Sequence, residues 1–268
     1  MTVKPCNGSC QRVQKPSHNS AMRFFYKAVP MIIVFITLLC VAGLRPVGAD
    51  RDSPGYARKI EGSSVEYPPD FRSVEPTFWL ITSISKDIFP DDPVQSVFFV
   101  YALLGIGLKF LAIHRCSKFS LTSMYVYFGT YFFLYETTQI RVGVASAFLL
   151  LSVQNIAQKN LKSFLLKACA AFLFHYQSLV MLPLYFLKAN RVNKVFYSVL
   201  PIVGILLGKT RLFDGILKNS LIFFPEILSF KLNSYLILQE HGVFAELNVL
   251  RSTYMYGLLI FYYSILLL

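Results

Sequence analysis

Long apolar stretches alternate with shorter polar segments along this chain. About 20 apolar residues in an α-helix span the hydrocarbon core of a bilayer. The stretches of this kind begin after residue 27 and recur to the last residue. They are 28–44, 94–113, 119–135, 140–157, 163–187, 195–207 and 253–268. We therefore expect an all-α, polytopic integral membrane protein with about six to seven apolar segments.

The polar segments predict the domain organisation. Residues 1–21 are basic and rich in Ser and Gln, which favours a disordered cytoplasmic tail before a single transmembrane domain over 22–268. Residues 45–93 and 209–252 are expected to be external loops that carry short amphipathic helices. In the first loop 78–84 is apolar enough to lie on the membrane surface, and in the second 221–238 has an interfacial pattern. Because the chain stops inside an apolar run, we expect a truncated C-terminus.

Two apolar segments allow two interpretations each. The first, 28–44, is either an uncleaved span, which we favour, or a signal peptide with Val47-Gly48-Ala49 as its cleavage site. The segment 163–187 is either one helix or a re-entrant hairpin of two half-length helices that turn near His175. We favour the hairpin, because it keeps the basic run 188–194 on the same side as the other basic loops.

The distribution of charge supports a membrane topology. The net charge is +12, yet the acids fall into 50–92, a lone Glu136 and 214–246, while the other loops carry only Lys and Arg. Short cytoplasmic loops collect basic residues in this way. The basic charge therefore indicates a cytoplasmic N-terminus and argues against a nucleic-acid partner. Cys6 and Cys10 have no nearby His partner, and we expect no metal site.

Ionisable and polar side chains gather at the predicted external ends of the segments. Arg141 begins the segment 140–157, and His175 lies inside 163–187, where ionisable groups are costly and usually functional. Their candidate neighbours follow the first segment, precede 78–84 or end the third segment. They are Arg45, Asp50, Arg51, Asp52, Tyr56, Glu75 and Glu136.

This combination suits group transfer from a phosphate-linked substrate. A carboxylate accepts the proton of an attacking hydroxyl, and Arg and His stabilise a phosphate leaving group. The planar fork of Arg binds two phosphate oxygens and stays charged, so no cofactor is expected. The structural alternative, given equal weight, is that Glu136 and Arg141 simply pair with each other. Lys109, near the inner end of 94–113, is expected to extend to the interface.

Four stretches resemble one known family. GLRPVGADRDSPGYARKI, VEPTFWLITSI, QIRVGVASAFLL and AAFLFHYQSLVMLPLYF follow, in order and spacing, the motifs of the EpsG family of Wzy-like polysaccharide polymerases, over about residues 40–190. The residues that fall on motif positions are Arg45, Asp50 (or Asp52), Tyr56, Glu75, Arg141 and His175.

The resemblance implies a glycosyltransferase in the bacterial cytoplasmic membrane. It would join polyprenyl-diphosphate-linked oligosaccharide units at the outer face, with a chain-length regulator or flippase as a protein partner. The expected catalytic residues are Asp50, Asp52, Glu75, Arg141 and His175. The expected substrate-binding residues are Arg45, Arg51, Tyr56 and Glu136.

Two other functions stay open at this point. One is a membrane O-acyltransferase that modifies surface glycans, with His175 as general base. The other is a transporter or flippase for lipid-linked glycans, with Arg141 and His175 on the substrate path. The large external loop favours an enzyme over a transporter.

Overall fold

The computed structural model describes residues 18–62, 74–186 and 193–209, with short pieces at 237, 256–257, 259–260 and 262–263. All regular structure in these residues is helical, which confirms the all-α prediction. All but residue 237 of the predicted interfacial helix 221–238, most of the last apolar segment and residues 1–17, with the cysteines of the tail, lie outside them. The first helix begins at His18, inside the segment predicted as a disordered tail.

The predicted segments correspond closely to the observed helices. The helices are α1 (His18–Gly43), α2 (Ser53–Glu61), α3 (Pro76–Ile88), α4 (Pro93–Cys116), α5 (Ser120–Tyr127), α6 (Ile140–Ala157), α7 (Leu161–Phe174) and α8 (Lys194–Lys209), with a π-helix η1 (Phe128–Thr138) and a 3-10 helix η2 (Tyr176–Phe186). The segment 119–135 is not one α-helix, because its second half winds as the π-helix η1.

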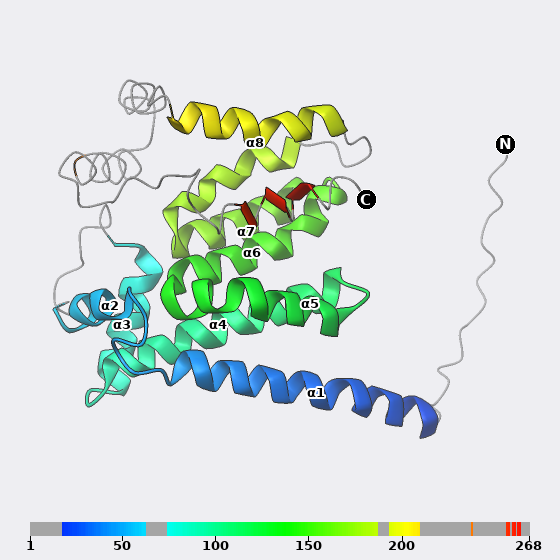
Figure 1. Ribbon diagram of the computed structural model, residues 1–268. Helices are drawn as coiled ribbons and strands as arrows, with labels where there is room; N and C mark the ends of the chain where they lie inside the picture. The colour runs from blue at the N-terminus through cyan, green and yellow to red at the C-terminus, as the bar shows by residue number, and fades with distance from the viewer. Residues whose placement is uncertain are drawn as a thin grey trace.

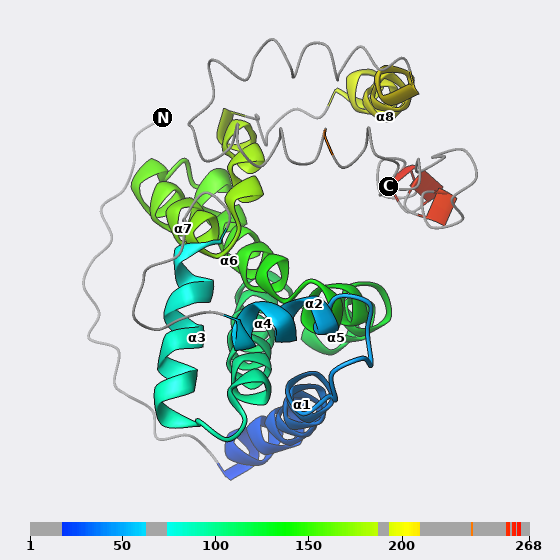
Figure 2. The same cartoon turned by 90° about the vertical axis from the view of Figure 1, so that its left-hand side faces the viewer.

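The longer helices form a layered bundle. α1 packs on α4, α4 on α6, and α6 on α7, while α8 lies at the opposite end of the stack from α1 (Figures 1 and 2). The short helices α2 and α3 both pack on α4, at the end of the bundle where α1 ends and α4 begins (Figure 1). This end is the face predicted to be external.

Local sequence explains where several helices start. Proline occupies the first turn of α2, α3 and α4, where its missing N–H is not needed. Asp92 caps α4 by accepting from the backbone N–H of Gln95 at 3.1 Å, and Asn160 caps α7 by accepting from Ser163 at 3.2 Å. These caps separate the external and internal turns from the apolar helices.

One hydrophobic cluster holds the short helices against the bundle. It combines residues of α2, α3, α4 and α6, all almost inaccessible to solvent: Tyr56, Ala57, Ile60, Phe78, Val94, Val97, Phe98, Tyr101, Ile140 and Val144. Apolar side chains that would otherwise meet water contribute roughly 1.5–3 kcal/mol each when they are buried. The cluster therefore fixes α2 and α3 relative to the start of α6, which carries Arg141.

The chain breaks at His175, as the hairpin interpretation predicts. His175 has extended backbone angles (φ −156°, ψ 112°) between α7 and η2. Farther along, the hydroxyl of Tyr185 donates to the carbonyl of Lys159 at 2.7 Å, and Nζ of Lys159 donates to the carbonyl of Tyr185 at 3.1 Å. These bonds bring the end of η2 back beside the start of α7. The segment is two half-length helices with His175 at the turn.

Two helices of the described residues, α4 and α6, are long and apolar enough to cross a membrane. The apolar parts of α1 and α8 are shorter, so the predicted number of six to seven segments is not established by these residues. Both α1 and α8 nevertheless expose large apolar side chains: Ile32, Ile33 and Ile36 on α1, and Val195, Phe196 and Ile202 on α8. Such continuous apolar exposure is typical of a surface in contact with lipid.

Candidate active site

A buried carboxylate, Glu75, joins the two ionisable side chains that the sequence singled out. Its Oε2 accepts a hydrogen bond from Nη1 of Arg141, and Nδ1 of His175 lies 3.5 Å from its Oε1. The Glu75 side chain is fully buried, whereas those of Arg141 and His175 are 18% and 17% exposed. The three residues come from the starts of α3 and α6 and from the end of α7. Helix packing thus assembles a triad from distant parts of the chain.

Two hydrogen bonds fix the position of this triad. Oγ1 of Thr77 donates to the carbonyl of Leu173 at 2.8 Å, and the hydroxyl of Tyr176 donates to the carbonyl of Val74 at 3.2 Å. Both bonds join the residues around Glu75 to the residues around His175. These side-chain-to-backbone hydrogen bonds therefore keep the Glu75 carboxylate close to the His175 imidazole.

Aromatic rings surround the guanidinium of Arg141. Its Cζ lies 5.5 Å from the ring centroid of Tyr56 and 5.6 Å from that of Phe78, which are cation–π distances. Burial raises the pKa of the Tyr56 hydroxyl, an effect that the nearby Arg141 charge opposes in part. Nε of Arg141 is buried and makes no hydrogen bond within the described residues. Arg141 is thus held by Glu75 and by two aromatic rings.

Arg141 lines a basic cavity. It has a volume of about 270 Å³, and its lining contains four cations and one carboxylate: Arg51, Asp52, Pro54, Gly55, Tyr56, Arg58, Lys59 and Arg141. Arg51, Arg58 and Lys59 are exposed, while Arg141 is mostly buried, so positive charge extends from the surface to the base of the cavity. Low-dielectric surroundings strengthen the attraction of such a cavity for an anion. Its chemistry fits a phosphate or diphosphate group.

Arg58 and Lys59 were not among the residues predicted from the sequence. Both sit in the last turn of α2, where basic residues also favour the helix dipole. A signal was present, because Arg51, Arg58 and Lys59 lie close together in the sequence. The loop 45–93 was expected to carry short helices, but only 78–84 was singled out within it, so the basic residues in the last turn of α2 were missed.

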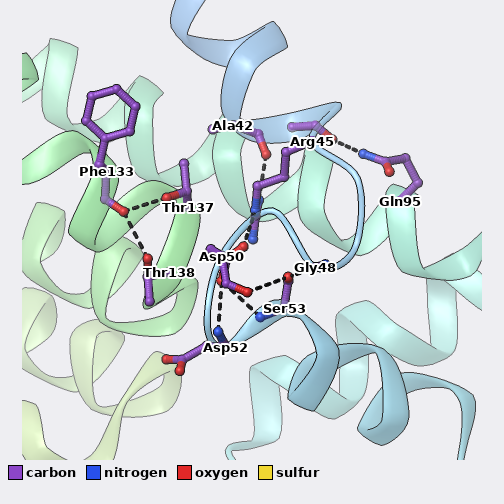
Figure 3. A network of polar contacts seen from close by, with 11 residues as sticks. Ala42, Arg45, Gly48, Asp50, Asp52, Ser53, Gln95, Phe133, Thr137 and Thr138 are labelled. Atoms are coloured by element: carbon purple, nitrogen blue, oxygen red, sulfur yellow. Dashed lines mark hydrogen bonds and ion pairs between the residues drawn. The ribbon is translucent and has the colours of Figure 1, made fainter.

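Arg45 and Asp50 form a separate pair beside this cavity (Figure 3). Nε of Arg45 donates to Oδ2 of Asp50 at 2.9 Å. Cζ of Arg45 lies 4.2 Å from the ring centroid of Phe98. Oδ1 of Asp50 accepts the backbone N–H groups of Asp52 and Ser53 at 3.0 and 2.9 Å. The pair thus closes the turn that leads into α2.

The surroundings of Asp50 favour its charged form. Burial alone would raise its pKa, but the hydrogen bond from Arg45 and the two backbone N–H groups lower it below the ordinary value of 3.8. Neither Arg45 nor Asp50 lines the basic cavity, whereas Asp52 does. The structure therefore gives the predicted roles of Arg45 in diphosphate binding and Asp50 as base no direct support.

Comparison with known proteins decides the family. The model of the EpsG family matches residues 28–268, nearly the whole chain. The chain belongs to the EpsG family. No curated protein and no solved structure matches it significantly. Membership confirms the resemblance found in the sequence and extends it beyond residue 190. With the apolar helices, it identifies a membrane protein of polysaccharide biosynthesis.

The structure divides the EpsG motif residues into two groups. Tyr56, Glu75, Arg141 and His175 meet around the base of the basic cavity. Arg45 and Asp50 meet in the adjacent turn, which positions α2 and therefore Tyr56. The motifs, far apart in the chain, converge on one end of the bundle.

Two sequence expectations for this EpsG protein were wrong. Glu136, expected in an external turn, is 1% exposed and accepts a hydrogen bond from Nζ of Lys109 instead of pairing with Arg141. Lys109, expected to extend to the interface, is 5% exposed and also donates to the carbonyl of Gly143 at 2.9 Å. Glu136 does not line the basic cavity, so its predicted role in substrate binding there lacks support. The π-helix η1 carries this carboxylate into the bundle.

Proposed function

We propose that this EpsG-family protein is a membrane glycosyltransferase that polymerises polyprenyl-diphosphate-linked oligosaccharide repeat units. The product would be an exopolysaccharide, a capsule or an O-antigen, assembled at the outer face of a bacterial cytoplasmic membrane. The observation that carries the proposal is Arg141 at the base of a basic cavity, held by the buried carboxylate of Glu75.

The reaction needs a site that stabilises a diphosphate as it leaves. The hydroxyl oxygen of the acceptor attacks the anomeric carbon of the donor sugar, the bond from that carbon to the diphosphate oxygen breaks, and the lipid diphosphate departs with the electron pair. Arg141, Arg51 and Arg58, which line the basic cavity, would neutralise the growing negative charge. A preorganised donor of this kind contributes roughly 100- to 1,000-fold to a rate.

The proton of the acceptor hydroxyl must pass to a base. Among the three carboxylates considered from the sequence, Asp52 lines the basic cavity, Asp50 is bound in the turn and Glu75 is engaged by Arg141. Asp52 is therefore our first candidate for the base. Glu75 is assigned as a positioning residue that orients Arg141, and His175 adds a second contact to the same carboxylate.

Replacement of Arg141 tests the proposal. In cells that depend on this gene for polymer, Arg141→Ala should reduce polymer by about 100-fold or more while single lipid-linked units accumulate. Arg141→Lys, which keeps the charge but loses the planar fork, should recover only part of the activity. Lys118→Ala is the matched control, because Lys118 is an exposed cation that does not line the cavity.

Two outcomes would speak against the proposal. Polymer of normal amount and length from a well-expressed Arg141→Ala protein would remove Arg141 from the reaction. Lipid-linked units that fail to reach the outer face, shown by surface labelling, would favour the flippase instead. Transfer of a labelled acyl group to glycan by the purified protein would favour the acyltransferase.

A further inference from the structure

A second cavity lies in the apolar half of the bundle, away from the basic one. Its volume is about 480 Å³, and its lining residues come from α4, α5, η1, α6, α7 and η2. Cavities that hold small molecules measure about 300–1,000 Å³. The space is therefore large enough for a ligand, and nothing in the proposed polymerase chemistry uses it.

The floor of this cavity is buried and its rim is exposed. Phe164 and Tyr127 in the floor are 1% and 5% exposed. At the rim, Val126, Leu150 and Val153 are 40%, 37% and 51% exposed, although all three are apolar. In a membrane protein an apolar rim of this kind faces hydrocarbon rather than water. The cavity thus opens sideways toward the acyl region of the bilayer.

The charge within the cavity is already neutralised. Lys109 is the charged residue of the lining, and its ammonium is engaged by Glu136 and by the carbonyl of Gly143. It also lies 5.6 Å from the ring centroids of Tyr127 and Tyr135. A charged ligand would find no free partner here, and an apolar cavity does not hold water favourably. The chemistry selects an uncharged, apolar occupant.

We propose that this cavity binds the aliphatic chain of a membrane lipid, which enters sideways between α5 and α6. The chain would pack against the aromatic and aliphatic side chains that line the cavity, and a preformed cavity offers it dispersion contacts that mobile lipid does not. Linear acyl chains and branched isoprenoid chains share this chemistry. The proposal does not rest on the polymerase reaction.

Photo-crosslinking of the full-length protein in lipid nanodiscs tests this site. Two probes are used in parallel: a phosphatidylglycerol with a diazirine at the end of one acyl chain, and a polyisoprenyl phosphate with a terminal diazirine. After irradiation, mass spectrometry compares labelled peptides from the α5 and α6 lining with peptides from α1. Lipid that merely surrounds the protein labels the exposed face of α1 as well, so the ratio measures occupation of the cavity.

The proposal predicts labelling of the lining by at least one probe, and the more efficient probe identifies the source of the chain. Val153→Trp and Leu150→Trp, which place bulk at the rim, should abolish the excess labelling. Ile33→Trp on α1 is the matched control, because Ile33 is 59% exposed and does not line the cavity.

Thermal unfolding of each variant shows whether it folds. Failure of both probes to label the lining above the level of α1 would overturn the proposal. Unchanged labelling in both rim variants, at unaltered melting temperature, would overturn it equally. Normal polymer in Arg141→Ala would refute the polymerase proposal, but intact labelling of the lining would leave this site standing, so the two proposals fail separately.

Discussion

Gly105 offers the sharpest test of the buried charges in this fold. The glycine lies on α4 against the carboxylate of Glu136, and a Cβ added there would lie 2.1 Å from Oε2. Gly143 on α6 approaches the same oxygen, with its added Cβ at 3.1 Å. Both glycines thus make room for a carboxylate between two helices. Gly107, two residues on, would place its Cβ no closer than 4.0 Å to Phe35.

The cost of Gly105→Ala follows from this geometry. Overpacking a tight interior costs roughly 1–3 kcal/mol. The carboxylate cannot yield freely, because Lys109 holds it, and separating a buried ion pair costs roughly 3–5 kcal/mol. If Gly105→Ala separates the ion pair in part, we expect the free energy of unfolding to fall by about 2–5 kcal/mol. Gly107→Ala should be almost neutral, since it meets only ordinary contact distances.

Thermal unfolding in mild detergent gives the melting temperatures of Gly105→Ala and Gly107→Ala. The single tryptophan of the chain, Trp79, lies half-buried on α3 and reports on the folded state by its fluorescence. A loss of 1 kcal/mol lowers the melting temperature of a chain of this size by about 2–4 °C. Gly105→Ala should therefore melt at least about 4 °C below both wild type and Gly107→Ala.

A variant background without the ion pair shows whether contact with the Glu136 carboxylate causes the loss of stability. With Lys109→Met and Glu136→Ala already in place, Gly105→Ala should cost less than about 1 kcal/mol, because the oxygen it strikes is absent. The reasoning is refuted if Gly105→Ala is as stable as Gly107→Ala. It is refuted equally if the cost is the same in both backgrounds.

Three further predictions concern the ion pairs. Lys109→Met alone should destabilise the protein by about 3–5 kcal/mol, because it leaves the buried Glu136 charge without a partner. Lys109→Met combined with Glu136→Leu removes both charges and should cost clearly less. Thermal unfolding distinguishes the two variants. Glu75→Gln should lower polymer formation about as much as Arg141→Lys, with the double variant no worse than either single one, since both act through one contact; additive losses would contradict this. The lowered pKa of Asp50 means that its ionised form stabilises the fold above pH 3.8 and that this contribution is lost as the pH falls through the folded-state value. The difference in melting temperature between wild type and Asp50→Asn should therefore shrink on acidification, and a constant difference would show that the Asp50 charge does not stabilise the turn.

Much of the architecture could be predicted from residue order alone. Two apolar segments long enough to cross a bilayer predicted α4 and α6. A backbone in lipid must satisfy its own hydrogen bonds, so a segment of this kind forms a helix. The basic run after residue 187 indicated the break at His175, because a single helix would have reversed the side on which basic loops lie. Each family motif is a short, continuous stretch of sequence, so the motifs too could be found without a structure.

The partners of the charged residues were decided by the tertiary structure. Arg141 had Glu136 five residues away in sequence, yet it binds Glu75, which lies 66 positions before it. Sequence spacing shows which face of a helix a side chain occupies, but the choice of partner depends on how α3, α6 and α7 pack. Likewise, no local sequence pattern predicts that η1 forms a π-helix, which turns Glu136 inward to Lys109.

The sequence by itself therefore determined the class of protein, the apolar segments, the family and six of the residues at the candidate site: Arg51, Asp52, Tyr56, Glu75, Arg141 and His175. The packing of the helices decided that Arg45 and Asp50 close a turn, that Arg58 and Lys59 join the basic cavity, and that a second, apolar cavity exists. The physical reason is the range of the interactions. Hydropathy and helix periodicity act over neighbouring residues, whereas ion pairs and cavities form only between segments that the fold brings together.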